Sequence, residues 1–172
     1  MKRVLFLTPF ALAALTGCAP APNQIQAGQW EVTQQLQSIQ MPGAPEEMAA
    51  EARSQVGRPQ TSRICLTEEQ AHNFLQFVRR GQPEGCRTTN EKYAGGQISL
   101  NATCPSPTGQ GSNNMSMNGN FTVTTFNTTI NEERANPLSP QGPVRISAVI
   151  RGRRLGDCPA NQPAPATPGG LG

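Results

Sequence analysis

The placement of five cysteines constrains this chain more than any other feature. Cys18 closes an apolar leader, and the other four follow at Cys65, Cys86, Cys104 and Cys158. An even number of cysteines behind an export leader favours disulfides, because exported proteins fold in an oxidising compartment. We therefore expect the mature chain to fold around two disulfides.

Three pairings of these four cysteines are open, and the sequence does not choose among them. We prefer Cys65 with Cys86 and Cys104 with Cys158, because the first bridge would tie down both ends of a predicted helical segment. Each bridge would contribute about 3 to 4 kcal/mol through chain entropy. Zinc is disfavoured, because no two of these cysteines are as close as the ligand pairs of tetrahedral sites. We expect no metal and no cofactor.

The leader has the parts of a lipoprotein signal peptide. Lys2 and Arg3 form a basic start, residues 4–15 are mostly apolar, and residues 15–18 read Leu-Thr-Gly-Cys. The apolar stretch is too short for a hydrocarbon core of about 30 Å, so a secretory leader is favoured over a membrane-spanning anchor. Residues 15–18 resemble the lipobox of bacterial lipoproteins, in which the cysteine becomes the acylated first residue.

This resemblance predicts a signal peptide over residues 1–17 and lipidation of Cys18, followed by a flexible tether up to residue 27. Acyl chains contribute about 0.8 kcal/mol per buried methylene, so they would anchor the chain to a membrane. Ala19 stands where inner-membrane lipoproteins carry Asp, which favours the outer membrane. We expect the bacterial cell envelope, on the periplasmic side. The alternative is a soluble secreted protein cleaved near Ala19.

The charge balance argues against a nucleic-acid partner. Lys and Arg total 14 against 11 Asp and Glu, and removal of Lys2 and Arg3 with the leader leaves 12 − 11, or +1. Basic residues are also not interleaved with aromatic stacking platforms. The partners we expect are the membrane, through the lipid anchor, and an unidentified envelope partner or small ligand.

One disulfide-stabilised domain is predicted over residues 28–158, with a disordered Pro/Gly-rich tail at 159–172. Alternation of apolar and polar residues predicts its strands. They lie near residues 28–39, 87–94, 97–104, 115–123 and 144–151. Gly95 and Gly96 supply the tight turn of a hairpin between the second and third strands.

Two helices are predicted, of which the second is the better marked. The first covers residues 46–55 and has a thin apolar stripe. The second covers residues 67–80, with Thr67 and Gln70 as a capping box and Phe74 on its apolar face. The fold class that follows is α+β: a curved antiparallel β-meander of about five strands with one packed amphipathic helix.

Several short blocks of the domain resemble one known family. They are Gly28–Val32, Cys65-Leu66-Thr67 with Gln70-Ala71, Cys86-Arg87, Gly95-Gly96, Cys104 and Arg151–Cys158. In these blocks and their order, the chain is similar to the bacterial exported domain-of-unknown-function family 3617. The resemblance implies an envelope protein, often a lipoprotein, with no established activity and no catalytic residues to carry over.

A cluster of three arginines near the last cysteine is a candidate anion-binding site. Arg151, Arg153 and Arg154 could hold a phosphate or an acidic headgroup, because the planar guanidinium binds oxyanions through two hydrogen bonds. On a strand, Arg151 and Arg153 share a face and Arg154 points away. The favoured alternative is that the cluster solvates a sheet edge and pairs with acidic residues of the domain. Those residues are Glu31, Glu91 and Asp157.

The chain has a single histidine, His72, with Glu68 one helical turn before it. A hydrolase could use His72 with Glu68, or with a serine such as Ser62. The helix places His72 on its wet side, however, so a solvated helix surface is the better interpretation. We expect a protein that is not an enzyme but a binding or structural module of the envelope.

Overall fold

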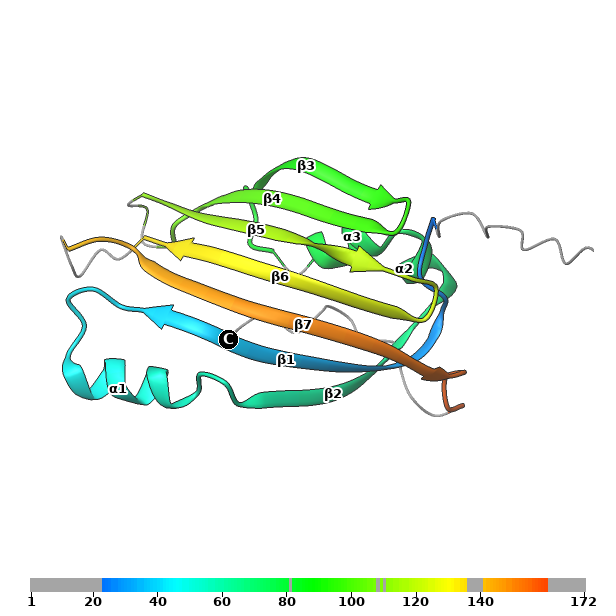
Figure 1. Cartoon of the computed structure of the whole chain (residues 1–172). Helices are drawn as coiled ribbons and strands as arrows, with labels where there is room; N and C mark the ends of the chain where they lie inside the picture. The colour runs from blue at the N-terminus through cyan, green and yellow to red at the C-terminus, as the bar shows by residue number, and fades with distance from the viewer. Residues whose placement is uncertain (1–22, 81, 108, 110, 136–140, 161–172) are drawn as a thin grey trace, which may run out of the picture.

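A computed structural model describes residues 23–160, apart from residues 81, 108, 110 and 136–140. A seven-stranded antiparallel sheet forms the body of the molecule (Figure 1). Its strands are β1 (Gly28–Gln40), β2 (Pro59–Leu66), β3 (Arg87–Ala94), β4 (Gln97–Pro105), β5 (Ser112–Phe121), β6 (Thr125–Arg134) and β7 (Val144–Gly156). They lie in the order β2-β1-β7-β6-β5-β4-β3, so β2 and β3 are the edges.

The predicted antiparallel sheet is confirmed, but the prediction of five strands and one packed helix was wrong in detail. β2 and β6 were missed. β2 is an edge strand whose residues up to Arg63 are exposed, so its sequence shows little apolar alternation. No strand was predicted between residues 123 and 144, where β6 lies, and Val123, predicted to end a strand, lies in the turn between β5 and β6.

Three short helices accompany the sheet: α1 (Glu46–Ser54), α2 (Glu68–His72) and α3 (Phe74–Arg79). The capping box is confirmed, because Thr67 Oγ1 accepts a hydrogen bond from the Gln70 amide and Gln70 Oε1 accepts one from the Thr67 amide, at 3.2 and 2.9 Å. The single helix predicted over residues 67–80 is divided at Asn73, where ψ is 45° and leaves the helical range.

The helices α2 and α3 pack on one face of the sheet, here called the inner face, near the start of β1 (Figure 1). Trp30 is fully buried there, and its ring centroid lies 5.5 Å from that of Phe126. Phe74 of α3 lies 5.8 Å from the same Phe126 ring. Gly152 lies directly beneath Phe126, since a Cβ at this position would come within 2.0 Å of the ring. The opposite face of the sheet is called the outer face.

The chain enters this core earlier than the predicted tether allows. Ile25 is only 1% exposed, and its amide donates a 2.7 Å hydrogen bond to the hydroxyl of Tyr93. The Trp30 indole also donates to the Gln26 carbonyl at 3.0 Å. The flexible tether predicted up to residue 27 was therefore too long, because Ile25 supplies an aliphatic side chain that the core buries. The first residues of the predicted tether, 18–22, lie outside the described part of the chain, as do the leader and most of the tail.

The two disulfides are present, but our preferred pairing was wrong. Cys65 pairs with Cys158, and Cys86 pairs with Cys104. The topology explains both bridges. Cys65 lies near the end of β2, and Cys158 follows the end of β7. Because β1 pairs with both strands, these two ends lie close together. The β3–β4 hairpin places Cys86 beside Cys104.

Candidate functional site

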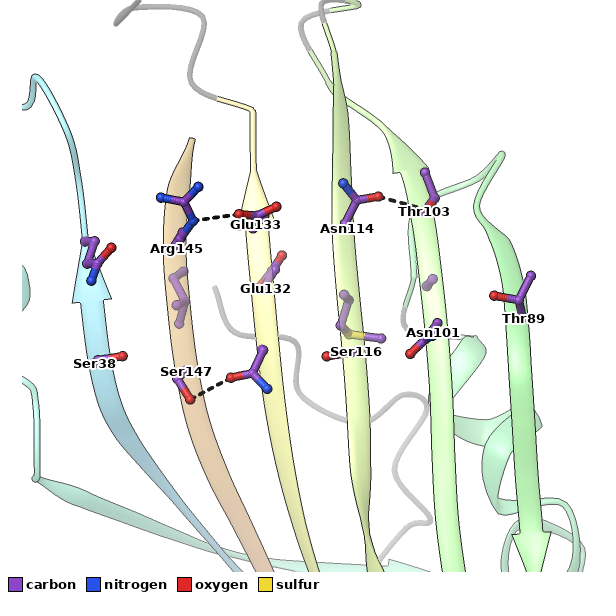
Figure 2. Close-up of a pocket in the computed structure, with 15 residues that line it drawn as sticks. Ser38, Thr89, Asn101, Thr103, Asn114, Ser116, Glu132, Glu133, Arg145 and Ser147 are labelled. Atoms are coloured by element: carbon purple, nitrogen blue, oxygen red, sulfur yellow. Dashed lines mark hydrogen bonds and ion pairs between the residues drawn. The ribbon is translucent and has the colours of Figure 1, made fainter. Parts of the chain in front are cut away.

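An open groove of about 670 Å³ lies on the outer face of the sheet (Figure 2). It is at the end of the sheet where β1 ends and β7 begins, away from α2 and α3. Six strands line it, all except the edge strand β2. We call this feature the outer groove.

A row of short polar side chains crosses the outer groove at right angles to the strands. Each of the six strands contributes one residue, and each residue is paired in register with the next. In order from β3 to β1 they are Thr89, Asn101, Ser116, Asn131, Ser147 and Ser38. We call these six residues the polar row. All six are uncharged and carry a hydroxyl or an amide.

A second row runs alongside the first and contains the charges of the outer face in this region. Thr103 donates a hydrogen bond of 2.9 Å from its hydroxyl to Asn114 Oδ1. Arg145 Nε donates to Glu133 Oε1 at 2.6 Å, so these two charges neutralise each other (Figure 2). Gln40 completes this row on β1.

Glu132 is also among the lining residues, but it lies between Asn131 and Glu133 on β6, so its side chain points to the inner face. Arg134, two residues along β6, donates hydrogen bonds from Nε and Nη2 to the two carboxylate oxygens of Glu132, at 2.8 and 3.1 Å. A bidentate pair of this kind is geometrically specific and holds both side chains in place. The groove therefore offers a neutral surface of hydrogen-bond donors and acceptors.

The three arginines singled out from the sequence do not converge on one site. Arg153 lies on the outer face and forms an ion pair with Glu31 at 2.9 Å. Arg154 is 15% exposed; its Nε donates to the Ala27 carbonyl and its Nη2 to Asp157, each at 2.7 Å. Arg151 is exposed and forms no ion pair within the described part of the chain. Arg153 and Arg154 thus pair with Glu31 and Asp157, as the favoured alternative expected. The sheet edge was wrong, because β7 lies between β1 and β6, and Glu91 pairs with Arg79 instead.

His72 is exposed, as its helical position predicts. Its Nδ1 lies 2.7 Å from Gln24 Oε1. Between residues 23 and 160, with the gaps stated above, no hydrogen bond joins His72 to Glu68. The structure therefore supplies no acid–base pair at this point of the helix surface.

The described residues contain no group of three or more His, Cys, Asp or Glu side chains placed to hold a metal ion. Over the same residues, no helix has the length and apolar character needed to cross a membrane. The outer groove cannot be recognised from the sequence alone, because its residues come from six strands and are polar residues of ordinary type.

Comparison with known proteins gives one match. A family model described as "Protein of unknown function (DUF3617)" matches residues 25–158. The match begins at Ile25, where the chain enters the core, and ends at Cys158, the disulfide partner of Cys65. No curated protein and no solved structure matches the chain.

Proposed function

The chain belongs to the DUF3617 family, and we propose that it is a non-enzymatic binding module of the bacterial cell envelope, anchored to a membrane through lipid on Cys18. The observation that carries the proposal is the outer groove. Its volume of about 670 Å³ is within the range of roughly 300 to 1,000 Å³ that small-molecule sites occupy. The leader pattern that ends at Cys18 supplies the reason to place the protein at a membrane.

The position of the groove suits a protein that is anchored at its N-terminus. Ile25 follows Cys18 by 25 − 18, or 7, residues, a distance of at most about 25 Å for an extended chain. β1 then runs away from this entry point, and the groove is lined by residues at its far end, Ser38 and Gln40. At about 3.3 Å per residue, the strand carries the groove roughly 30 Å from the entry point. An anchored domain would thus present the groove away from the bilayer.

The chemistry of the lining favours binding over catalysis. Of the two glutamates among the described lining residues, Glu133 is paired with Arg145, and Glu132 points to the inner face and is paired with Arg134. A general acid or base needs a side chain that can exchange a proton with substrate. Among the described lining residues there is no His, Cys or Lys. A hydrolase based on His72 and Glu68 has less support, since His72 bonds to Gln24 on an exposed helix surface.

Native mass spectrometry of the protein extracted gently from its own envelope tests this proposal. We expect the chain to begin at an acylated Cys18 and to carry a bound small molecule or a crosslinked neighbour. A Ser116→Arg variant fills the middle of the groove and should lose that partner, while His72→Ala should keep it. A chain that is bare in every preparation would overturn the binding function. A chain that is unacylated and cleaved elsewhere would overturn the anchor.

A further inference from the structure

The polar row contains only short, uncharged side chains. Ser, Thr and Asn are residues that proteins mostly expose to solvent. Here six neighbouring strands contribute only Ser, Thr and Asn to one row. Short side chains leave room above the sheet along this row.

The row offers both hydrogen-bond donors and hydrogen-bond acceptors. Ser147 donates its hydroxyl to Asn131 Oδ1 at 2.9 Å, which leaves the Asn131 amide nitrogen as a donor toward the groove. Asn101 and Ser116 make no side-chain hydrogen bond to other described residues. A hydroxyl group both donates and accepts, and an Asn side chain has two donors and one acceptor oxygen. A ligand rich in hydroxyl groups can satisfy all of them.

Charged and apolar ligands fit this lining poorly. The charges at its border on the outer face, Glu133 and Arg145, are already paired with each other. A charged ligand would lose water without gaining a partner of opposite sign, which is costly. An apolar ligand would cover the row and leave its donors and acceptors unsatisfied, at about 1 to 3 kcal/mol for each group.

The spacing of the row favours a chain of linked units over a single small molecule. Neighbouring strands lie about 4.8 Å apart, so six strands extend the row over roughly 24 Å. A chain laid along the row meets a new hydrogen-bonding group at every strand. An extended peptide would need charged or apolar pockets for its alternate side chains, and the row has neither.

We propose that the outer groove binds a neutral oligosaccharide, which lies across the strands along the polar row. This inference rests on the proposed function, because it names the ligand class of the same groove. The sugar hydroxyls exchange hydrogen bonds with Asn101, Ser116 and Asn131 at the centre of the row. No bond is formed or broken in the ligand.

Calorimetric titration of the purified full chain with defined oligosaccharides tests the ligand class. The probes are neutral glucan and N-acetylglucosamine oligomers, an anionic oligouronate of equal length and an uncharged peptide. We expect the neutral sugars to bind and the double variant Asn101→Ala/Asn131→Ala to weaken that binding about tenfold. The matched control is Asn118→Ala/Asn127→Ala, which removes two exposed Asn side chains from the outer face outside the groove. It should bind like the natural chain.

The outcomes separate this inference from the function it rests on. Preferential binding of the oligouronate or the peptide would overturn the sugar assignment and leave a binding module. If no neutral sugar binds but native mass spectrometry shows a bound compound, the sugar assignment is likewise overturned and the binding module stands. Failure of every probe together with a bare chain would overturn both. If the Asn101→Ala/Asn131→Ala variant has a lowered melting temperature, Ser116→Gln serves as the test instead, because it narrows the same groove. Unchanged sugar binding by Ser116→Gln would then overturn the inference.

Discussion

Removing the two disulfides one at a time should destabilise the domain by unequal amounts. Cys65–Cys158 joins residues 93 apart in sequence, whereas Cys86–Cys104 joins residues 18 apart. Each bridge has one buried member, Cys65 or Cys104, and one half-buried member. Double Cys→Ala variants therefore lose similar packing, so the comparison isolates the effect of loop length.

The difference can be worked out from the two loop lengths. In the chain-entropy treatment, closing a loop of 93 residues raises the free energy of the unfolded state by about 4.6 kcal/mol at 25 °C. Closing the loop of 18 residues raises that free energy by about 3 kcal/mol. The Cys65→Ala/Cys158→Ala variant should lose roughly 1.5 kcal/mol more than Cys86→Ala/Cys104→Ala. For a domain of this size, the longer-loop variant should melt roughly 15 °C lower than the natural protein.

Urea unfolding of the oxidised protein and both double variants measures these losses as free energies of unfolding. Digestion without reductant, followed by mass spectrometry, identifies which cysteine peptides are joined. Equal losses, or a larger loss for the shorter loop, would refute the loop-length reasoning. A peptide that joins Cys65 to Cys86 would refute the pairing itself.

Three further predictions concern the core. Gly152→Ala should cost about 2 kcal/mol in urea unfolding, because its methyl group overlaps the Phe126 ring. Adding Phe126→Leu should recover part of that loss, whereas additive losses would contradict the overlap. Burial raises the pKa of Tyr93 from 10.0 to about 12, against the lowering by the Ile25 amide. The Tyr93 phenol ionises at lower pH in the unfolded chain than in the folded one. The free energy of unfolding should therefore be constant below about pH 10 and fall as the pH rises toward 12. An ultraviolet titration of this single tyrosine with a midpoint near pH 10 would disprove the shift. Phe74→Asp should abolish the folded circular dichroism spectrum, and a native-like spectrum would contradict the placement of Phe74 in the core.

The features predicted correctly from the sequence are those set by neighbouring residues. The turn at Gly95 and Gly96 fixed the β3–β4 hairpin, and Thr67 and Gln70 fixed the start of α2. The hairpin also explains the Cys86–Cys104 disulfide. Its register places Arg87 opposite Thr103, so Cys86, which precedes Arg87, lies beside Cys104, which follows Thr103. The preferred pairing overlooked this consequence.

The features that the sequence did not reveal depend on contacts between distant segments. Cys65 meets Cys158 only because β1 separates β2 from β7 in the sheet. The polar row likewise exists only across six strands. Along the chain, Asn101, Ser116 and Asn131 are ordinary outward-facing strand residues, which is the usual pattern of an antiparallel sheet with one solvated face. The correct order and register of the strands would be needed to find the row.

The proposed binding site, the outer groove, can be tested directly in solution. The direct measurement is a nuclear magnetic resonance titration of the isotope-labelled full chain with a neutral oligosaccharide. Shifts in the amide signals should concentrate on the polar row: Thr89, Asn101, Ser116, Asn131, Ser147 and Ser38. Shifts centred instead on the exposed arginines Arg151 and Arg153, or on α2 and α3, would contradict the proposed site.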